Sequence, residues 1–412
     1  MFAIPSRSFT HPARSLANLF SSQIALHAGC PLSHPCAAAA PGTPGRNPAA
    51  ILSLLLLVCI CASGCGLGTL TSLSQAKTKK AESATNGAGL NFVPDLHADA
   101  SKDLNAYANY SAQIRVYLDQ ENFDQIDAIA DEVRSQKSRF AGGAWKLQKL
   151  YCGLREPANS RQASDAVWQV QIGQLKKWVE RKPKSITARV GLAAAYVEYA
   201  WHGRGRGFAG TVSEEGWKLL ATRMATGKEI LDQAKKMTDK CPHWYEVMLT
   251  IGMGQSWEMD EYNKVFEEAI AFEPAYHYFY GDKAEYLLPR WHGEPGDWER
   301  FADEMSKRLG GKLGSIIYYQ IAMDVVDCYK DREFVTETKV SWPRIKQGFA
   351  DLEERDGASA RAMNLLCRLA GQAEDKPFTQ ELLKRIGDNW DPETWGTKEY
   401  FEHYKAWAAS GD

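Results

Sequence analysis

The chain is predicted to be all-α, with a stack of helical hairpins following an N-terminal leader. From Ser101 onward, apolar residues recur at the three- and four-residue spacing of a helix, and long alternating runs of β-branched residues are absent. Proline or glycine stands where one helix would end and the next begin. The body, residues 101–412, should therefore contain roughly a dozen helices. The prolines at these joints are Pro157, Pro183, Pro242, Pro274, Pro343, Pro377 and Pro392.

The first hairpin is predicted at the start of this body. Each of its two helices carries an apolar stripe, and a pair this short cannot bury both stripes by itself. Further pairs must therefore stack on it. The stripes consist of Leu104, Tyr107, Ala108, Ile114, Tyr117 and Leu118 in the first helix, and of Phe123, Ile126, Ile129, Ala130 and Val133 in the second.

The clearest repeating unit covers residues 243–274. Near its end, Phe266 precedes Ala269 by three residues and Pro274 follows Ala269 by five. This spacing resembles the second helix of a tetratricopeptide repeat. In that repeat a small residue lets neighbouring helices approach closely, and the proline ends the helix before the next unit. The resemblance implies a superhelix of stacked helical hairpins.

Residues 188–196 resemble the first helix of the same repeat, with Leu192, Ala193 and Tyr196 at the matching positions. The partner of this helix, around Leu231, is expected only after a long insertion. The repeat period is therefore irregular, and we expect roughly three to five degenerate helix pairs in a tetratricopeptide-like superhelix.

The N-terminal region has the features of an export signal. Residues 49–62 form an apolar run that is shorter than the roughly 20 residues of a membrane-spanning helix. The small residues that follow it end at Cys65, and this junction resembles the lipobox of bacterial lipoprotein precursors. The resemblance implies that residues 1–64 are removed, that Cys65 carries the lipid and that residues 65–100 form a flexible tether. Gly66 resembles the pattern of lipoproteins held at the outer membrane of Gram-negative cells.

The long leader before the apolar run leaves two interpretations open. Residues 1–48 contain arginine and serine but no acidic residue. They are either the result of an upstream start codon or an organelle-type transit segment.

Charge and cysteine usage exclude several classes of function for the body. The formal net charge of the whole chain is −2, and the residues from 101 onward are mildly acidic, which argues against a nucleic-acid partner. The cysteines of the body show no Cys-x-x-Cys spacing, so neither a zinc knuckle nor a thioredoxin-like pair is expected. Buried free thiols are favoured over disulfides. These cysteines are Cys152, Cys241, Cys328 and Cys367.

The middle of the body contains a set of aromatic and Gly-rich segments: Ala200-Trp201 before the Gly/Arg stretch, residues 211–217, His243-Trp244-Tyr245, residues 254–257, and residues 284–291. With these segments, about residues 140–310 resemble the DUF4034 family of uncharacterised bacterial domains. The family name implies no activity.

Residues 202–210 contain a Gly-x-Gly-x-x-Gly pattern, but a helix is predicted before it where a dinucleotide site requires a strand. We interpret the segment as a loop closed by Thr211 as an N-cap, with Glu214 completing a capping box. Two interpretations of Arg204 and Arg206 stay open: they bind an anionic ligand or lipid headgroup, or they belong to a solvated loop.

The segment 286–298 places Arg290, Trp291 and His292 among aromatic residues and prolines. Tryptophan and arginine are enriched at binding hot spots, so these residues are candidates for partner binding. The competing interpretation is packing at a helix joint, with Asp297 capping the next helix. His243 and His277 are interpreted as isolated buried or surface histidines. We identify no catalytic constellation, cofactor or metal site.

The sequence therefore predicts a lipid-anchored, periplasmic scaffold that binds a protein or peptide. Two alternatives are an anion-binding hydrolase that uses Arg290 and His292, and a purely structural spacer.

Overall fold

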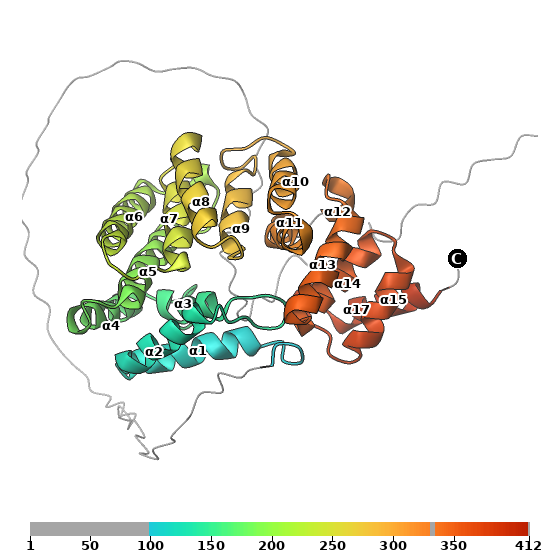
Figure 1. The fold of residues 1–412 in the computed structure, drawn as a ribbon, viewed down its shortest axis with the longest axis horizontal. Coiled ribbons are helices and arrows are strands. Elements are labelled where there is room, and N and C mark those ends of the chain that lie inside the picture. The colour runs from blue at the N-terminus through green and yellow to red at the C-terminus, as the bar shows by residue number, and fades with distance from the viewer. Residues whose placement is uncertain (1–98, 330–333, 411–412) are drawn as a thin grey trace, which may run out of the picture. The chain divides into compact units, whose positions relative to one another are not determined.

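The computed structural model describes residues 99–329 and 334–410. This part of the chain contains seventeen α-helices and no β-strand, which confirms the all-α prediction (Figure 1). The helices are α1 (Ala106–Asp119), α2 (Phe123–Ser135), α3 (Lys146–Arg155), α4 (Asp165–Arg181), α5 (Ile186–Arg204), α6 (Glu214–Lys235), α7 (Pro242–Gly254), α8 (Met259–Phe272), α9 (Tyr278–Tyr286), α10 (Asp297–Leu309), α11 (Gly311–Val326), α12 (Phe334–Glu337), α13 (Trp342–Asp356), α14 (Ala360–Gln372), α15 (Lys376–Ile386), α16 (Pro392–Trp395) and α17 (Lys398–Ala409).

The leader, Cys65 and nearly all of the predicted tether lie outside the described residues. None of the helices in 99–329 and 334–410 has the length and hydropathy needed to cross a membrane.

The helices pack mainly on neighbours in the sequence. The odd-numbered helices α1 to α11 form one series in which each contacts the next, and α13 continues it from α11. The even-numbered helices α2, α6, α8 and α10 pack against the helix before them, and α4 packs against α5. Such contacts are those of hairpins added one after another, because each new pair buries the apolar stripe left open by the last.

The expected first hairpin and the 243–274 unit both form. The first is α1 with α2, where Ile114 and Ile126 are completely buried. The second is α7 with α8, where Phe266 and Ala269 are buried and Pro274 follows the last turn. The predicted stripe of α2 corresponds to its buried face. In α1 only Ile114 and Leu118 of the predicted stripe are buried, and Ala106 and Tyr110 supply the rest of the apolar buried face.

Two sequence expectations about the repeats are wrong. The described residues contain more helices than the dozen expected, because some of the stretches between the longer helices form short helices of their own. The partner of α5 does not follow a long insertion: α6 begins at Glu214, only a short connection after α5 ends at Arg204, and the two pack along each other.

Two predicted caps are also wrong. Ser213, not Thr211, caps α6, and its hydroxyl accepts a hydrogen bond from the backbone N–H of Gly216 at 3.0 Å. Thr211 instead donates its hydroxyl to the carbonyl of Phe208 at 2.8 Å. Asp297 is the first residue of α10 and accepts from the backbone N–H of Glu294. At α6 a second hydroxyl two residues further on takes the cap position, whereas α10 has Gly296 as its N-cap and no side-chain cap.

Contacts between distant parts of the sequence join the start of the described chain to its later helices. The backbone N–H of Ala360 donates to the carbonyl of Ala100 at 2.9 Å, and that of Gly142 donates to the carbonyl of Gly357 at 2.8 Å. Residues 99–105 and 139–145 therefore pack on the turn between α13 and α14, a closure that the hairpin pattern did not predict.

Candidate functional site

Arg204 organises the loop that follows α5. Its guanidinium donates to the carbonyls of Gly205 and Gly207 at 3.1 and 3.0 Å. The same group lies 5.7 Å from the ring centroid of Trp201 and 5.1 Å from that of Trp217, within cation–π range. Because its donors face backbone carbonyls, Arg204 supports the loop rather than presenting a free charge.

The neighbouring side chains are more exposed. Phe208 is 47% exposed and Trp217 is 41% exposed, and Arg206 is also exposed. Large aromatic side chains at this level of exposure leave apolar area in contact with water. We call the set formed by Arg204, Arg206, Phe208 and Trp217 the loop surface.

The second candidate segment engages several different partners. Arg290 forms an ion pair with Glu285 at 2.9 Å and lies 3.1 Å from Cys328 Sγ. His292 is exposed, and its ring stacks on Tyr286 with centroids 4.4 Å apart. Partial desolvation lowers the pKa of His292. Arg290 and His292 thus contact different groups.

Trp291 connects the two candidate segments. It is partly buried, and its ring meets that of Trp201 edge to face at 5.9 Å. The C-terminal end of α5, which carries Arg204, is therefore in contact with the loop after α9. The structure brings Arg204 and Trp291 into one region through Trp201.

A buried ionisable cluster lies elsewhere, and the sequence analysis missed it. On α7, Nδ1 of His243 lies 2.7 Å from Oε2 of Glu246, and both side chains are almost completely buried. The hydroxyl of Tyr276 donates to the same carboxylate oxygen at 2.8 Å. The signal that could have revealed the pair is Glu246 three residues after His243, which places both on one helix face.

An ion pair from two other helices completes the cluster. Arg155 of α3 lies with Nε 3.2 Å from Oε1 of Glu198 on α5. Burial raises the pKa of Glu198 to about 7, although the charge of Arg155 opposes the shift. Burial also acts to raise the pKa of Glu246, but His243, Arg155 and the Tyr276 hydroxyl together hold it below its ordinary value. The two carboxylates therefore differ in protonation near neutral pH.

The cluster lines a small pocket of about 10 Å³, which is room for about one water molecule. Nε2 of His243 is buried and has no hydrogen-bond partner among the described residues. The lining residues are Arg155, Ala194, Val197, Glu198, His243, Glu246, Val247 and Thr250.

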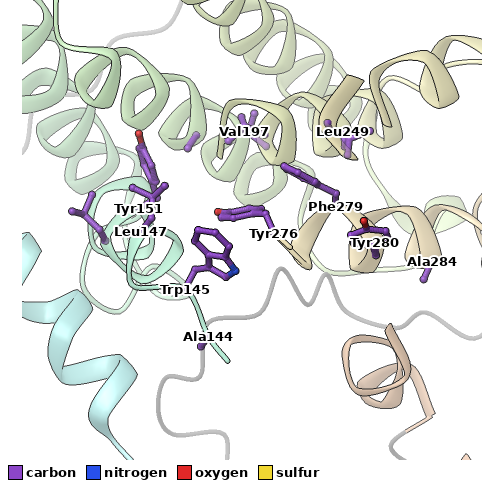
Figure 2. Close-up of a cluster of buried hydrophobic side chains, with 14 of the residues drawn as sticks. Ala144, Trp145, Leu147, Tyr151, Val197, Leu249, Tyr276, Phe279, Tyr280 and Ala284 are labelled. Carbon is purple, nitrogen blue, oxygen red and sulfur yellow. The ribbon is translucent and has the colours of Figure 1, made fainter. Parts of the chain in front are cut away.

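Aromatic side chains hold this pocket in place. Tyr151 stacks on His243 with ring centroids 4.1 Å apart and an interplanar angle of 12°. Trp145 meets Tyr276 edge to face at 5.0 Å, and Figure 2 shows these rings beside Phe279 in the buried cluster. Since the rings are packed on several sides, the histidine has little freedom to turn.

The described residues contain no group of three or more His, Cys, Asp or Glu side chains that could hold a metal ion. No disulfide joins the four cysteines of the described residues, and the prediction of buried thiols holds for three of them, Cys152, Cys241 and Cys367. Comparison with protein-family models, with curated proteins and with solved structures finds no match for this chain.

Proposed function

We propose that this chain is a lipid-anchored scaffold of the cell envelope that binds a protein or peptide partner. The observation that carries the proposal is the loop surface, where Phe208 and Trp217 are exposed beside Arg204 and Arg206. An exposed arginine on an ordered loop and an exposed tryptophan in the first turn of the next helix are typical of the residues that dominate binding energy at interfaces.

The ordering of the loop supports this proposal. Arg204 holds the carbonyls of Gly205 and Gly207 and stacks on Trp217, so the aromatic side chain has a fixed support. A surface that is ordered before binding loses less conformational entropy when a partner docks. The lipobox-like junction at Cys65 supports the anchored location, because acylation there would tether the helical body to a membrane.

A capture experiment tests the binding role. The full chain, expressed in its membrane, would be crosslinked and purified with its partners, alongside a Phe208→Ala/Trp217→Ala variant. Tyr400→Ala serves as the matched control, because Tyr400 is an exposed aromatic residue of similar accessibility on α17. We expect the double variant to lose specific partners that the control retains. Unchanged partners in the double variant would exclude the loop surface as the binding site.

Mass spectrometry of the mature N-terminus tests the anchor. A diacylated or triacylated Cys65 is the expected result. An unmodified N-terminus upstream of Cys65 would contradict the lipoprotein assignment.

A further inference from the structure

The segment before α1 is fastened to the last helices of the described chain. The carbonyl of Ala100 accepts from the backbone at the start of α14. Two residues further on, the carbonyl of Lys102 accepts a hydrogen bond from Nδ2 of Asn389 at 2.9 Å. The carbonyl of Leu104 accepts one from the guanidinium of Arg361 at 3.4 Å. Three alternate backbone carbonyls of this segment therefore hold α14 and the connection between α15 and α16.

The loop between α2 and α3 reaches the same place. Gly142, whose N–H is bonded to the carbonyl of Gly357, has a φ of +85°, and a Cβ added to it would lie 2.6 Å from Oγ of Ser359. Gly143 approaches as closely, because its added Cβ would lie 2.7 Å from Cδ1 of Leu352. Only a residue without a Cβ fits so near to the turn between α13 and α14. The contact between this loop and the turn therefore depends on both glycines.

The last helices of the chain form a group that is attached at two places. Helices α14 to α17 pack mainly on one another and on the short helix α12. They meet α13 where the rings of Trp342 and Phe378 lie 6.1 Å apart and Nε1 of Trp342 donates to Asp375 at 2.9 Å. The two early segments supply the second attachment, at the first turn of α14. A group held at both places cannot turn about the connection between α13 and α14, where Gly357 has a φ of +79°.

In an array of stacked hairpins the terminal units have a neighbour on one side only, and they open most easily. We propose that residues 99–105 and 139–145 form a latch that joins α14–α17 to the first hairpin, so that the two ends of the array open and close together. The latch is separate from the hairpin cores, because none of the main helix-to-helix contacts of the described residues joins α1, α2 or α3 to α13–α17. It therefore opens without unfolding the hairpins on either side.

Hydrogen exchange of the full chain in detergent, followed by mass spectrometry, tests the latch. Gly142→Ala brings a Cβ against Ser359 and should open it, with amide exchange in α16 and α17 at least tenfold faster than in the wild type. These helices are not part of the latch, so their exchange reports opening and not local strain. Gly310→Ala is the matched control, because Gly310 has a φ of +65° and nothing within 4 Å of an added Cβ. Equal exchange in α16 and α17 of the two variants would overturn the proposal.

A second measurement leaves the latch residues unchanged. Gly371→Ala would place a Cβ 2.1 Å from the ring of Tyr404 and so loosens α14 from α17. Because coupling between two sites is reciprocal, exchange at residues 139–145 should also become at least threefold faster, while exchange in α5 and α6 stays as in the wild type. Unchanged exchange at residues 139–145, or an equal rise in α5 and α6, would contradict joint opening of the two ends. Neither measurement involves the loop surface, so both outcomes are separate from the binding test.

Discussion

His243 and Glu246 lie one helical turn apart on α7 and form a buried pair, with Nδ1 of the imidazole 2.7 Å from Oε2 of the carboxylate. Tyr276, from the segment before α9, donates to the same oxygen. A carboxylate with no solvent contact is tolerated only where donors satisfy it. The pair therefore ties α7 to the next hairpin through a polar contact inside an apolar region.

Removing the Glu246 side chain should destabilise the fold strongly. Glu246→Ala leaves His243 and Tyr276 without their shared acceptor and opens a cavity, so we expect a loss of about 3–5 kcal/mol in the free energy of unfolding. Urea denaturation measures it. The control is Glu229→Ala at an exposed position on α6, which should change stability by less than about 0.5 kcal/mol. A loss below about 1 kcal/mol for Glu246→Ala would show that the buried pair has little structural importance.

Two glycines should respond in opposite directions to alanine. A Cβ on Gly153 would lie 2.3 Å from the backbone oxygen of Ser111, where α1 and α3 pack, so Gly153→Ala should cost about 2–3 kcal/mol. A Cβ on Gly173 in α4 meets nothing within 4 Å, and Gly173→Ala should stabilise by about 0.5–1 kcal/mol through helix propensity. Thermal unfolding of the Gly153→Ala and Gly173→Ala variants measures both changes in stability. A neutral Gly153→Ala would mean that α1 and α3 are not in such close contact.

The Glu198 carboxyl should make stability fall as pH rises. Its pKa is raised from 4.5 to about 7 in the folded state, so the folded protein retains a proton that the unfolded chain has lost. The stabilisation is complete below pH 4.5 and is lost as the pH rises through 7. Between pH 5 and 7.5 the stability of the wild type relative to Glu198→Gln should fall by about 1–3 kcal/mol. Urea unfolding at both pH values measures this difference. A difference that is constant or that rises with pH would contradict the raised pKa.

The start of α6 should depend on Ser213 and not on Thr211. Ser213→Ala removes the hydroxyl that accepts from the N–H of Gly216 and should cost about 1 kcal/mol. Thr211→Ala removes a bond to the carbonyl of Phe208 outside the helix, and its effect should stay within about 0.5 kcal/mol. Chemical denaturation of the two variants distinguishes them, and equal losses would show that both hydroxyls support the helix.

Only part of the candidate site could be predicted from the sequence. Arg204 and Trp291 were recognised by composition, and the structure places them in one region through Trp201. Arg290 was recognised in the same way, but its ion pair with Glu285 gives it a local structural partner. The His243–Glu246 pair was readable from its three-residue spacing. The partners Tyr276 and Arg155 were not, because nothing in local sequence relates α3 and the segment before α9 to α7.

The amino-acid sequence by itself determined that the body is helical and which face of most helices is buried. Helical periodicity is a local property, so Ile114, Phe266 and Ala269 could be assigned to the core without knowledge of their neighbours. Tertiary structure alone decided that Ala100 meets Ala360 and that Arg155 faces Glu198. Each of these depends on the angle at which successive hairpins stack, and that angle is set by the packing of many side chains together.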